Sequence, residues 1–133
     1  MLERLLNIGF KKAGEWALVE GEVVCNLEAE ANSSNVLYSF VSGGDILYIG
    51  KTVQPLKRRL YGYQKPAPTQ STNIKGNKLI VQALNAGTPI SVFVLPDHGL
   101  LHYGGFHINL AAGLEDSLIN QVKPLWNQVG LGS

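Results

Sequence analysis

Hydrophobic runs divide the chain into a short series of expected strands. Two uninterrupted apolar segments, Val36–Tyr38 and Leu47–Gly50, each carry one tyrosine, and the two tyrosines lie ten residues apart. Turn residues bound both runs and no polar residue alternates within them, so they are predicted to be the buried strands of one hairpin. Ile90–Leu95 has the same character and is predicted to be a third strand.

Periodic apolar positions predict helices around these strands. Leu2, Leu5, Leu6 and Phe10 form the stripe of a short helix that Gly14 is expected to end. The other expected helices begin at Pro55, at about Asn73 and at Gly113, and they end near Tyr63, Ala86 and Lys123. Residues 16–27 are predicted to form one or two strands broken at Gly21, and the remaining segments are expected to be loops (28–35, 64–72) or an irregular or hairpin insertion (97–109).

This order of elements predicts an α/β (α+β) fold with a small, mainly antiparallel three-stranded central sheet flanked by helices. The length of 133 residues fits a single domain with a core of its own. Within it we expect a core over residues 36–127 and an extra N-terminal helix and strand segment, residues 1–35, of unknown role.

The two tyrosines make the register of the hairpin important. A buried phenol needs a hydrogen-bond partner, so Tyr38 and Tyr48 suggest a polar pocket against the core. An odd loop, Ser42–Gly44 with Gly44 in the left-handed conformation, would place the two tyrosines directly opposite each other. An even loop of two glycines would send them to opposite faces. We expect the odd loop.

The composition indicates a cellular compartment and argues against a secreted or a membrane-spanning protein. Cys25 is the only cysteine, so no internal disulfide forms and a reducing environment fits. The N-terminus lacks a signal-peptide pattern, and no apolar run reaches membrane-spanning length. A cytoplasmic protein without membrane contact is therefore expected.

Charge is distributed unevenly although the net charge is only +1. Residues 1–45 hold three basic and seven acidic residues, and residues 46–133 hold eight basic and three acidic ones. Five of the eight basic residues lie between Lys51 and Lys65, a concentration that attracts phosphate, although a solvated helix face is the simpler reading. The candidate nucleic-acid contacts are Lys57, Arg58, Lys65, Lys75 and Lys78.

Helical wheels single out two charged residues. Glu115 falls inside the apolar arc of the last helix, about 140° wide, where a carboxylate needs a partner or a metal. The alternative is a helix-start glutamate that interacts with the helix dipole. Arg59 lies at the margin of the inward face of the basic helix, whereas Arg58 and Lys57 point away. Its alternative role is a buried salt bridge, for example with Glu115.

Three histidines, His98, His102 and His107, lie within ten residues. Their spacing fits no common compact zinc site and no cysteine joins them, so packing within a loop is the expectation. Cys25 is expected to be a small buried hydrophobic residue.

Together these residues resemble the GIY-YIG nuclease superfamily, in particular its restriction-endonuclease and excision-repair branches. Tyr38 matches the first motif, although Val36 stands where the family has glycine. The second motif is present in full. The matching residues, from about Val36 to Asn127, are Tyr38, Tyr48-Ile49-Gly50, Lys51-Thr52, Arg59, Tyr63, Glu115 and Asn127.

The resemblance implies a DNA endonuclease that uses a single Mg²⁺ or Mn²⁺ ion. Tyr38 would be the general base, Glu115 the metal ligand and Arg59 the contact to the scissile phosphate. Tyr48, Tyr63 and Lys51 would position water and phosphate, with Gly50 and Asn127 in supporting roles. A tyrosine is a poor base at neutral pH, so Lys51, Arg59 or the metal must make its phenolate less costly.

One alternative stays open, a catalytically silent nucleic-acid-binding module on the same scaffold. The intact set of Tyr38, Arg59 and Glu115 argues against it.

Overall fold

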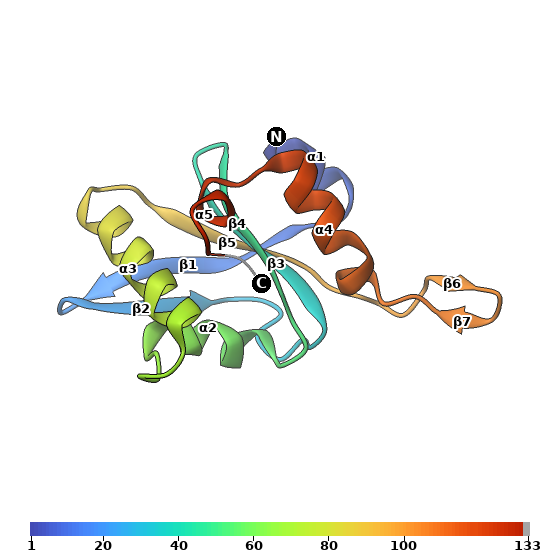
Figure 1. The fold of residues 1–133 in the computed structure, drawn as a ribbon, viewed down its shortest axis with the longest axis horizontal. Helices are drawn as coiled ribbons and strands as arrows, with labels where there is room; N and C mark the ends of the chain where they lie inside the picture. Colours follow the sequence, from blue (N-terminus) through green and yellow to red (C-terminus); the bar gives the residue numbers. More distant parts are fainter. Residues whose placement is uncertain (132–133) are drawn as a thin grey trace.

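A five-stranded antiparallel sheet forms the centre of the computed structural model, which describes residues 1–131 (Figure 1). The spatial order of the strands is β2-β1-β5-β3-β4. The strands are β1 (Lys11–Val19), β2 (Glu22–Leu27), β3 (Val36–Ser42), β4 (Asp45–Thr52) and β5 (Ile90–Leu95), with a separate small hairpin of β6 (His102–Tyr103) and β7 (Phe106–His107). The helices are α1 (Leu2–Asn7), α2 (Leu56–Gln64), α3 (Ser71–Asn85), α4 (Leu110–Val122) and α5 (Leu125–Gln128).

The sheet is larger than the three strands predicted. The N-terminal segment contributes β1 and β2, because β1 pairs with the edge of β5 that β3 leaves free, as in the pair Trp16 and Ile90. Gly14 was predicted to end the first helix, but in the structure it lies inside β1. A Cβ on Gly14 would stand 2.1 Å from the carbonyl oxygen of Asn26, so only glycine permits this close approach of β1 and β2.

The hairpin of β3 and β4 corrects the expected register. Its loop is the even one, because Ser42 pairs with Asp45, and it is Gly43, not Gly44, that takes a positive φ of 62°. A bulge then inserts Leu47 between the pairs Val41–Ile46 and Phe40–Tyr48. This extra residue shifts the side-chain alternation of β4 by one position, and so it cancels the shift that the even loop introduces.

Tyr38 and Tyr48 consequently share a face of the sheet, as predicted, but they are not directly opposite each other. Gly50 is the residue opposite Tyr38, and Phe40 is the residue opposite Tyr48. The tyrosine rings meet diagonally, with 6.0 Å between their centroids.

Two hydrophobic clusters, one on each face, hold the sheet between helices. The first joins Tyr38, Phe40 and Tyr48 to Leu60 of α2 and Ile80 of α3. The second packs residues of α1 and α4, among them Leu5 and Ala111, against Leu37, Ile49 and Leu95 of the sheet. Trp16 of β1 contacts the rings of Phe40 and Tyr63, so the N-terminal segment belongs to the same packing as the tyrosine hairpin.

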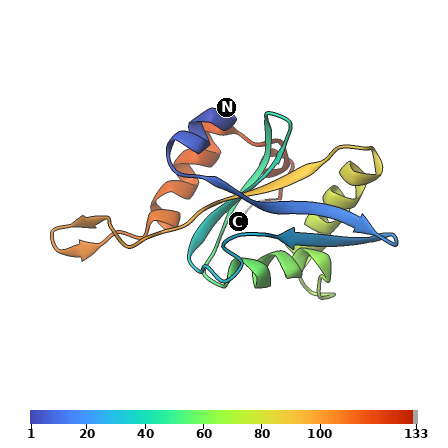
Figure 2. The same cartoon turned by 180° about the vertical axis from the view of Figure 1, so that it is seen from behind.

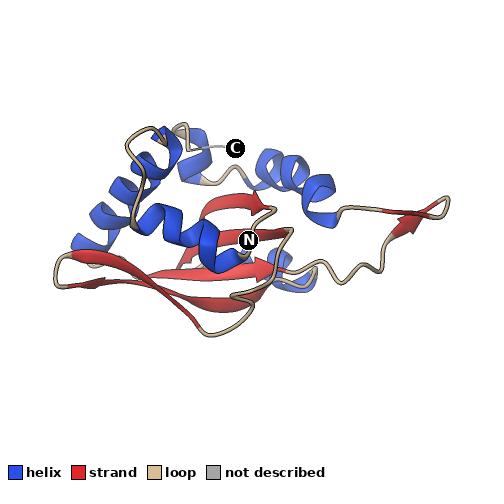
Figure 3. Ribbon diagram, turned by 90° about the horizontal axis from the view of Figure 1, so that it is seen from below, coloured by secondary structure: helices blue, strands red, loops and turns tan. Residues whose placement is uncertain are grey.

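The β6–β7 hairpin extends well beyond this layered body, as the view from behind and the view from below both show (Figure 2, Figure 3). Within residues 1–131, no helix is long and apolar enough to cross a membrane.

Candidate active site

Arg59 and two buried tyrosines, Tyr38 and Tyr63, form a continuous hydrogen-bonded cluster, and a third buried tyrosine, Tyr48, packs against it. The hydroxyls of Tyr38 and Tyr63 share a hydrogen bond of 2.9 Å, and Nη2 of Arg59 donates to the Tyr63 hydroxyl at 2.8 Å. The Tyr48 ring packs against Tyr38. The helix α2 brings Arg59 and Tyr63 together because they lie four residues apart, about one turn.

Helix α3 supplies residues that fix this cluster and that the sequence did not identify. Oδ1 of Asn73 accepts a hydrogen bond of 2.7 Å from Nη1 of Arg59, and Nδ2 of Asn77 donates to the carbonyl oxygen of Tyr63 at 2.8 Å. The backbone of Gly76 packs directly against the Tyr63 ring, because a Cβ at this position would come within 2.6 Å of two ring carbons. In the sequence these residues are only polar or small positions on a predicted helix, and nothing there marks them as partners of Arg59 or Tyr63.

Two supporting residues act on the edge strand β4. A Cβ on Gly50 would lie 2.8 Å from the Tyr38 hydroxyl, so glycine leaves the space that the phenol occupies. The side-chain amide of Asn127 pairs with both backbone groups of Ile49, accepting from its N–H and donating to its carbonyl oxygen at 3.0 Å each. Asn127 therefore holds the free edge of β4 beside the tyrosines.

Lys51 and Glu115 form the second part of the predicted site. Nζ of Lys51 lies 3.6 Å from Oε1 of Glu115, and the Glu115 side chain is 5% exposed. Glu115 lies on the buried side of α4, as its place in the apolar arc predicted, and Lys51 forms an ion pair with it. Successive strand residues point to opposite faces, so Lys51 leaves β4 on the other side from Tyr48 and Gly50.

A groove of about 770 Å³ is lined by one residue of each part, Arg59 of the cluster and Lys51 of the ion pair. Lys51, Arg58, Arg59 and Lys65 all line it, together with polar residues at the start of α3, and none of its lining residues is acidic. Of the predicted nucleic-acid contacts, Arg58 and Lys65 therefore border this groove. The other three, Lys57, Lys75 and Lys78, are exposed and lie outside it.

Burial controls the ionisation of the phenols. It raises the pKa of Tyr38 well above its usual value, and the neighbouring tyrosines raise it further while Arg59 opposes them. Burial likewise raises the pKa of Tyr48. For Arg59, burial lowers the pKa, but interactions with the phenols of Tyr38, Tyr63 and Tyr48 outweigh it and the net shift is upward. The arginine is thus a permanent cation, and the phenols of Tyr38 and Tyr48 are neutral at physiological pH.

The remaining candidates fall outside this site. Among residues 1–131 no three His, Cys, Asp or Glu side chains are grouped as a metal site. His102 and His107 lie on paired strands, and Nε2 of His107 is 3.5 Å from Asp97. Burial raises the pKa of Cys25 to about 12, which keeps it a neutral thiol.

The architecture is that of the GIY-YIG nucleases, which confirms at the level of the fold the resemblance seen in the motifs. The structure is similar to that of a mutant of bacteriophage T4 EndoII, with a TM-score of 0.73 and 22% identity over 96% of this chain and 98% of that chain. It is also similar to restriction endonuclease Hpy188I in complex with product DNA, with a TM-score of 0.56 and 16% identity over 90% of this chain and 77% of that chain. No protein-family model and no curated protein sequence matches the chain.

Proposed function

We propose that the protein is a metal-dependent endonuclease that hydrolyses DNA phosphodiester bonds at a GIY-YIG active site. The observation that carries the proposal is the chain of hydrogen bonds from Tyr38 through Tyr63 to Arg59, which reaches the basic groove on this fold. A binding module needs cations in its groove, but it does not need a buried phenol coupled to one of them.

Arg59 and Lys51 are the residues suited to hold the scissile phosphate. Both line the groove, and their positive charge would stabilise the negative charge that develops on the phosphoryl oxygens in the transition state. Asn73 and Tyr63 hold the Arg59 guanidinium at both terminal nitrogens, so little reorganisation is needed when the phosphate arrives.

Tyr38 is the proposed general base. Its phenolate oxygen would take a proton from water as the water oxygen bonds to phosphorus and the bond to the leaving deoxyribose oxygen breaks. The hydroxyl is fully buried and already bonded to Tyr63, so water must reach it from the groove side through a local rearrangement. Tyr48 and Tyr63 would keep the ring and the hydroxyl in place.

Glu115 fits the single metal ligand that the resemblance implies. Its carboxylate is buried, and Mg²⁺ is commonly bound through one or two carboxylates while water and substrate phosphate complete its coordination. When bound, Mg²⁺ or Mn²⁺ would supply positive charge to the phosphate and to the leaving oxygen. Lys51, now paired with Glu115, would then be free to contact the phosphate.

The test is cleavage of supercoiled plasmid and of short branched and linear duplexes, with Mg²⁺, with Mn²⁺ and with EDTA. Wild-type protein should cut only with metal. Glu115→Gln should bind the same DNA without cutting it, whereas Asp116→Asn, the adjacent exposed carboxylate on α4, should cut normally. Binding by wild-type protein without cleavage of any substrate would favour the silent binding module instead.

A further inference from the structure

A second hollow, here called the side pocket, lies between α2 and the edge strand β2, which run side by side (Figure 1, Figure 2). Its volume is about 550 Å³, within the range of pockets that hold small organic groups. Arg58 and Tyr61 line both the side pocket and the basic groove. They lie three residues apart, on one side of α2. The side pocket therefore adjoins the path proposed for the DNA.

The side pocket combines an exposed aromatic ring with apolar walls. Tyr61 is 56% exposed, although Tyr63, two residues further along α2, is fully buried in the cluster. Leu27 and Leu60 supply apolar lining. Aromatic and apolar side chains of this kind stack on nucleic-acid bases that have left the base stack. The cation that stabilises a phosphate beside such a base is present as well, because Arg58 lines the same pocket.

Gln64 gives the side pocket a hydrogen-bond donor with a fixed orientation. Its Oε1 accepts from the backbone N–H of Cys25 at 2.9 Å, so the amide cannot be turned the other way without losing this bond. Within residues 1–131 the amide nitrogen Nε2 takes part in no hydrogen bond. The charged residues of the lining, Lys57 and Arg58, also have only donors, and the lining contains no aspartate or glutamate. The pocket is therefore suited to a group that presents a carbonyl oxygen.

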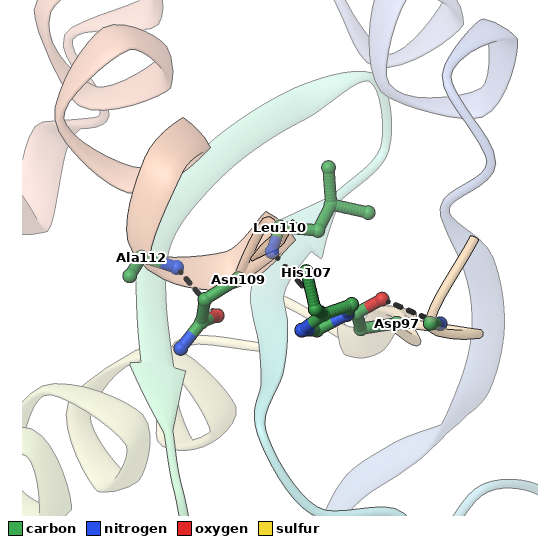
Figure 4. Close-up of polar contacts among 6 residues, drawn as sticks. Asp97, His107, Asn109, Leu110 and Ala112 are labelled. Atoms are coloured by element: carbon green, nitrogen blue, oxygen red, sulfur yellow. Dashed lines mark hydrogen bonds and ion pairs between the residues drawn. The ribbon is translucent and has the colours of Figure 1, made fainter. Parts of the chain in front are cut away.

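The apolar hollow of about 370 Å³ beside the start of α4 lacks these features. Asp97 lines it, and no lysine or arginine does. The carboxylate of Asp97 accepts from the backbone N–H groups of Gly99 and Leu110, at 2.8 and 3.3 Å, and lies 3.5 Å from Nε2 of His107 (Figure 4). A carboxylate in a lining without lysine or arginine repels the phosphates of DNA. A nucleotide therefore fits the side pocket and not this hollow.

We infer that the side pocket binds one unstacked base of the DNA and prefers a base with carbonyl oxygens, such as thymine, to adenine. Tyr61 stacks on the base, Nε2 of Gln64 donates to a carbonyl oxygen, and Arg58 contacts the adjoining phosphate. Adenine has no carbonyl oxygen, and its exocyclic amine would meet donors. The inference rests on the DNA binding of the proposed function and adds to it the selection of a base.

Fluorescence anisotropy with labelled duplexes tests the inference in EDTA, where no cleavage interferes. The duplexes are fully paired, or carry one unpaired thymine, or carry one unpaired adenine, because an unpaired base costs least to extrude. Wild-type protein should bind the thymine duplex about tenfold more tightly than the adenine duplex, as expected when one base offers the matching acceptor and the other does not.

Gln64→Glu is the decisive variant. A carboxylate can still accept from the N–H of Cys25, but it cannot donate to the base, so the preference for thymine should fall about tenfold. Gln82→Glu is the matched control, because it makes the same change at an exposed position of α3 outside the pocket and should keep the preference. Differences in stacking within the free duplexes affect both variants equally.

Tyr61 tests the stacking contact. Tyr61→Ala should reduce the advantage of the thymine duplex over the paired duplex about tenfold, whereas Tyr61→Phe should keep it, since the ring and not the hydroxyl stacks. Urea unfolding shows that each variant is folded.

Equal binding of the two unpaired bases by wild-type protein, or an unchanged preference in Gln64→Glu, would overturn the inference. The proposed function would stand in that case if paired duplex were still bound and cut with metal. Failure to bind any of the duplexes would refute the proposed function and the base pocket together.

Discussion

Arg59 and Arg58 are adjacent in sequence, yet their replacement by alanine should have different consequences. Both line the basic groove. Arg59 is partly buried and donates to Tyr63 at 2.8 Å and to Asn73 at 2.7 Å, whereas Arg58 is exposed on the outer side of α2. Arg59 is therefore a fixed charge coupled to the phenols, and Arg58 is a solvated charge beside the path of the DNA.

The magnitudes follow from these positions. Arg59→Ala removes a positioned charge from the transition state, which typically costs about 100-fold to 1,000-fold in rate. It also removes two charge-assisted hydrogen bonds, so the free energy of unfolding should fall by about 2–4 kcal/mol after allowance for the partial exposure of the guanidinium. Arg58→Ala should leave the rate at saturating DNA unchanged. It should reduce the slope of log K against log salt by about 0.9, the value for one phosphate contact.

Single-turnover cleavage at saturating DNA, DNA affinity across a salt series and urea unfolding measure the three quantities separately. Arg59→Lys sharpens the comparison, because it keeps the charge but cannot bond Tyr63 and Asn73 in the planar geometry of a guanidinium. It should recover little of the lost rate. If Arg58 governed turnover and Arg59 governed affinity, the role given to the Arg59 cluster would be refuted.

Three further predictions concern single side chains. Glu115→Ala should abolish Mg²⁺-dependent cleavage and leave the free energy of unfolding unchanged or higher, because it removes a carboxylate from the apolar side of α4; urea unfolding beside the plasmid assay checks both. Gly76→Ala should lower the free energy of unfolding by about 1–3 kcal/mol, because its Cβ would overlap the buried Tyr63 ring. The midpoint of urea unfolding should fall accordingly, and an unchanged midpoint would mean that the ring can move. Because the pKa of Tyr38 is raised in the folded protein, its contribution to the free energy of unfolding is fully present below the pKa of an unfolded tyrosine, about 10. Above that pH the contribution is lost, at about 1.4 kcal/mol per pH unit. Tyr38→Phe should therefore make the decline in the free energy of unfolding shallower, as urea titrations from about pH 8 to about pH 11 would measure.

The elements of the central hairpin were predictable because local pattern determines them. The third predicted strand, Ile90–Leu95, has the same bounds in the structure, and α2 begins at Leu56, one residue after the predicted start at Pro55. The burial of Glu115 also followed from helical geometry alone. In each case a run or a period of a few residues carries the information.

The features that the sequence did not yield depend on contacts between distant segments. The pairing of β1 with β5 joins residues more than seventy positions apart, for example Trp16 and Ile90, and no local pattern specifies that edge. The sequence likewise gives no sign of the bulge at Leu47, because an unpaired residue within an apolar run does not differ from its paired neighbours. Asn73 acquires its role only when α3 packs beside α2 and meets Arg59.

The direction of hydrogen bonding in the cluster bears on how Tyr38 could serve as a base. Arg59 has only donors, so the Tyr63 oxygen must accept from it. The Tyr63 hydroxyl proton then remains available for Tyr38, 2.9 Å away. Once Tyr38 has lost its proton, Tyr63 can donate to the phenolate while Arg59 polarises Tyr63, so the charge is shared along the chain of bonds. In the resting protein, burial and the neighbouring tyrosines outweigh the effect of Arg59 and keep the pKa of Tyr38 raised. Under the proposed function, Tyr38 therefore ionises only when further positive charge enters the groove, which couples the base to occupation of the site and keeps the empty protein inactive.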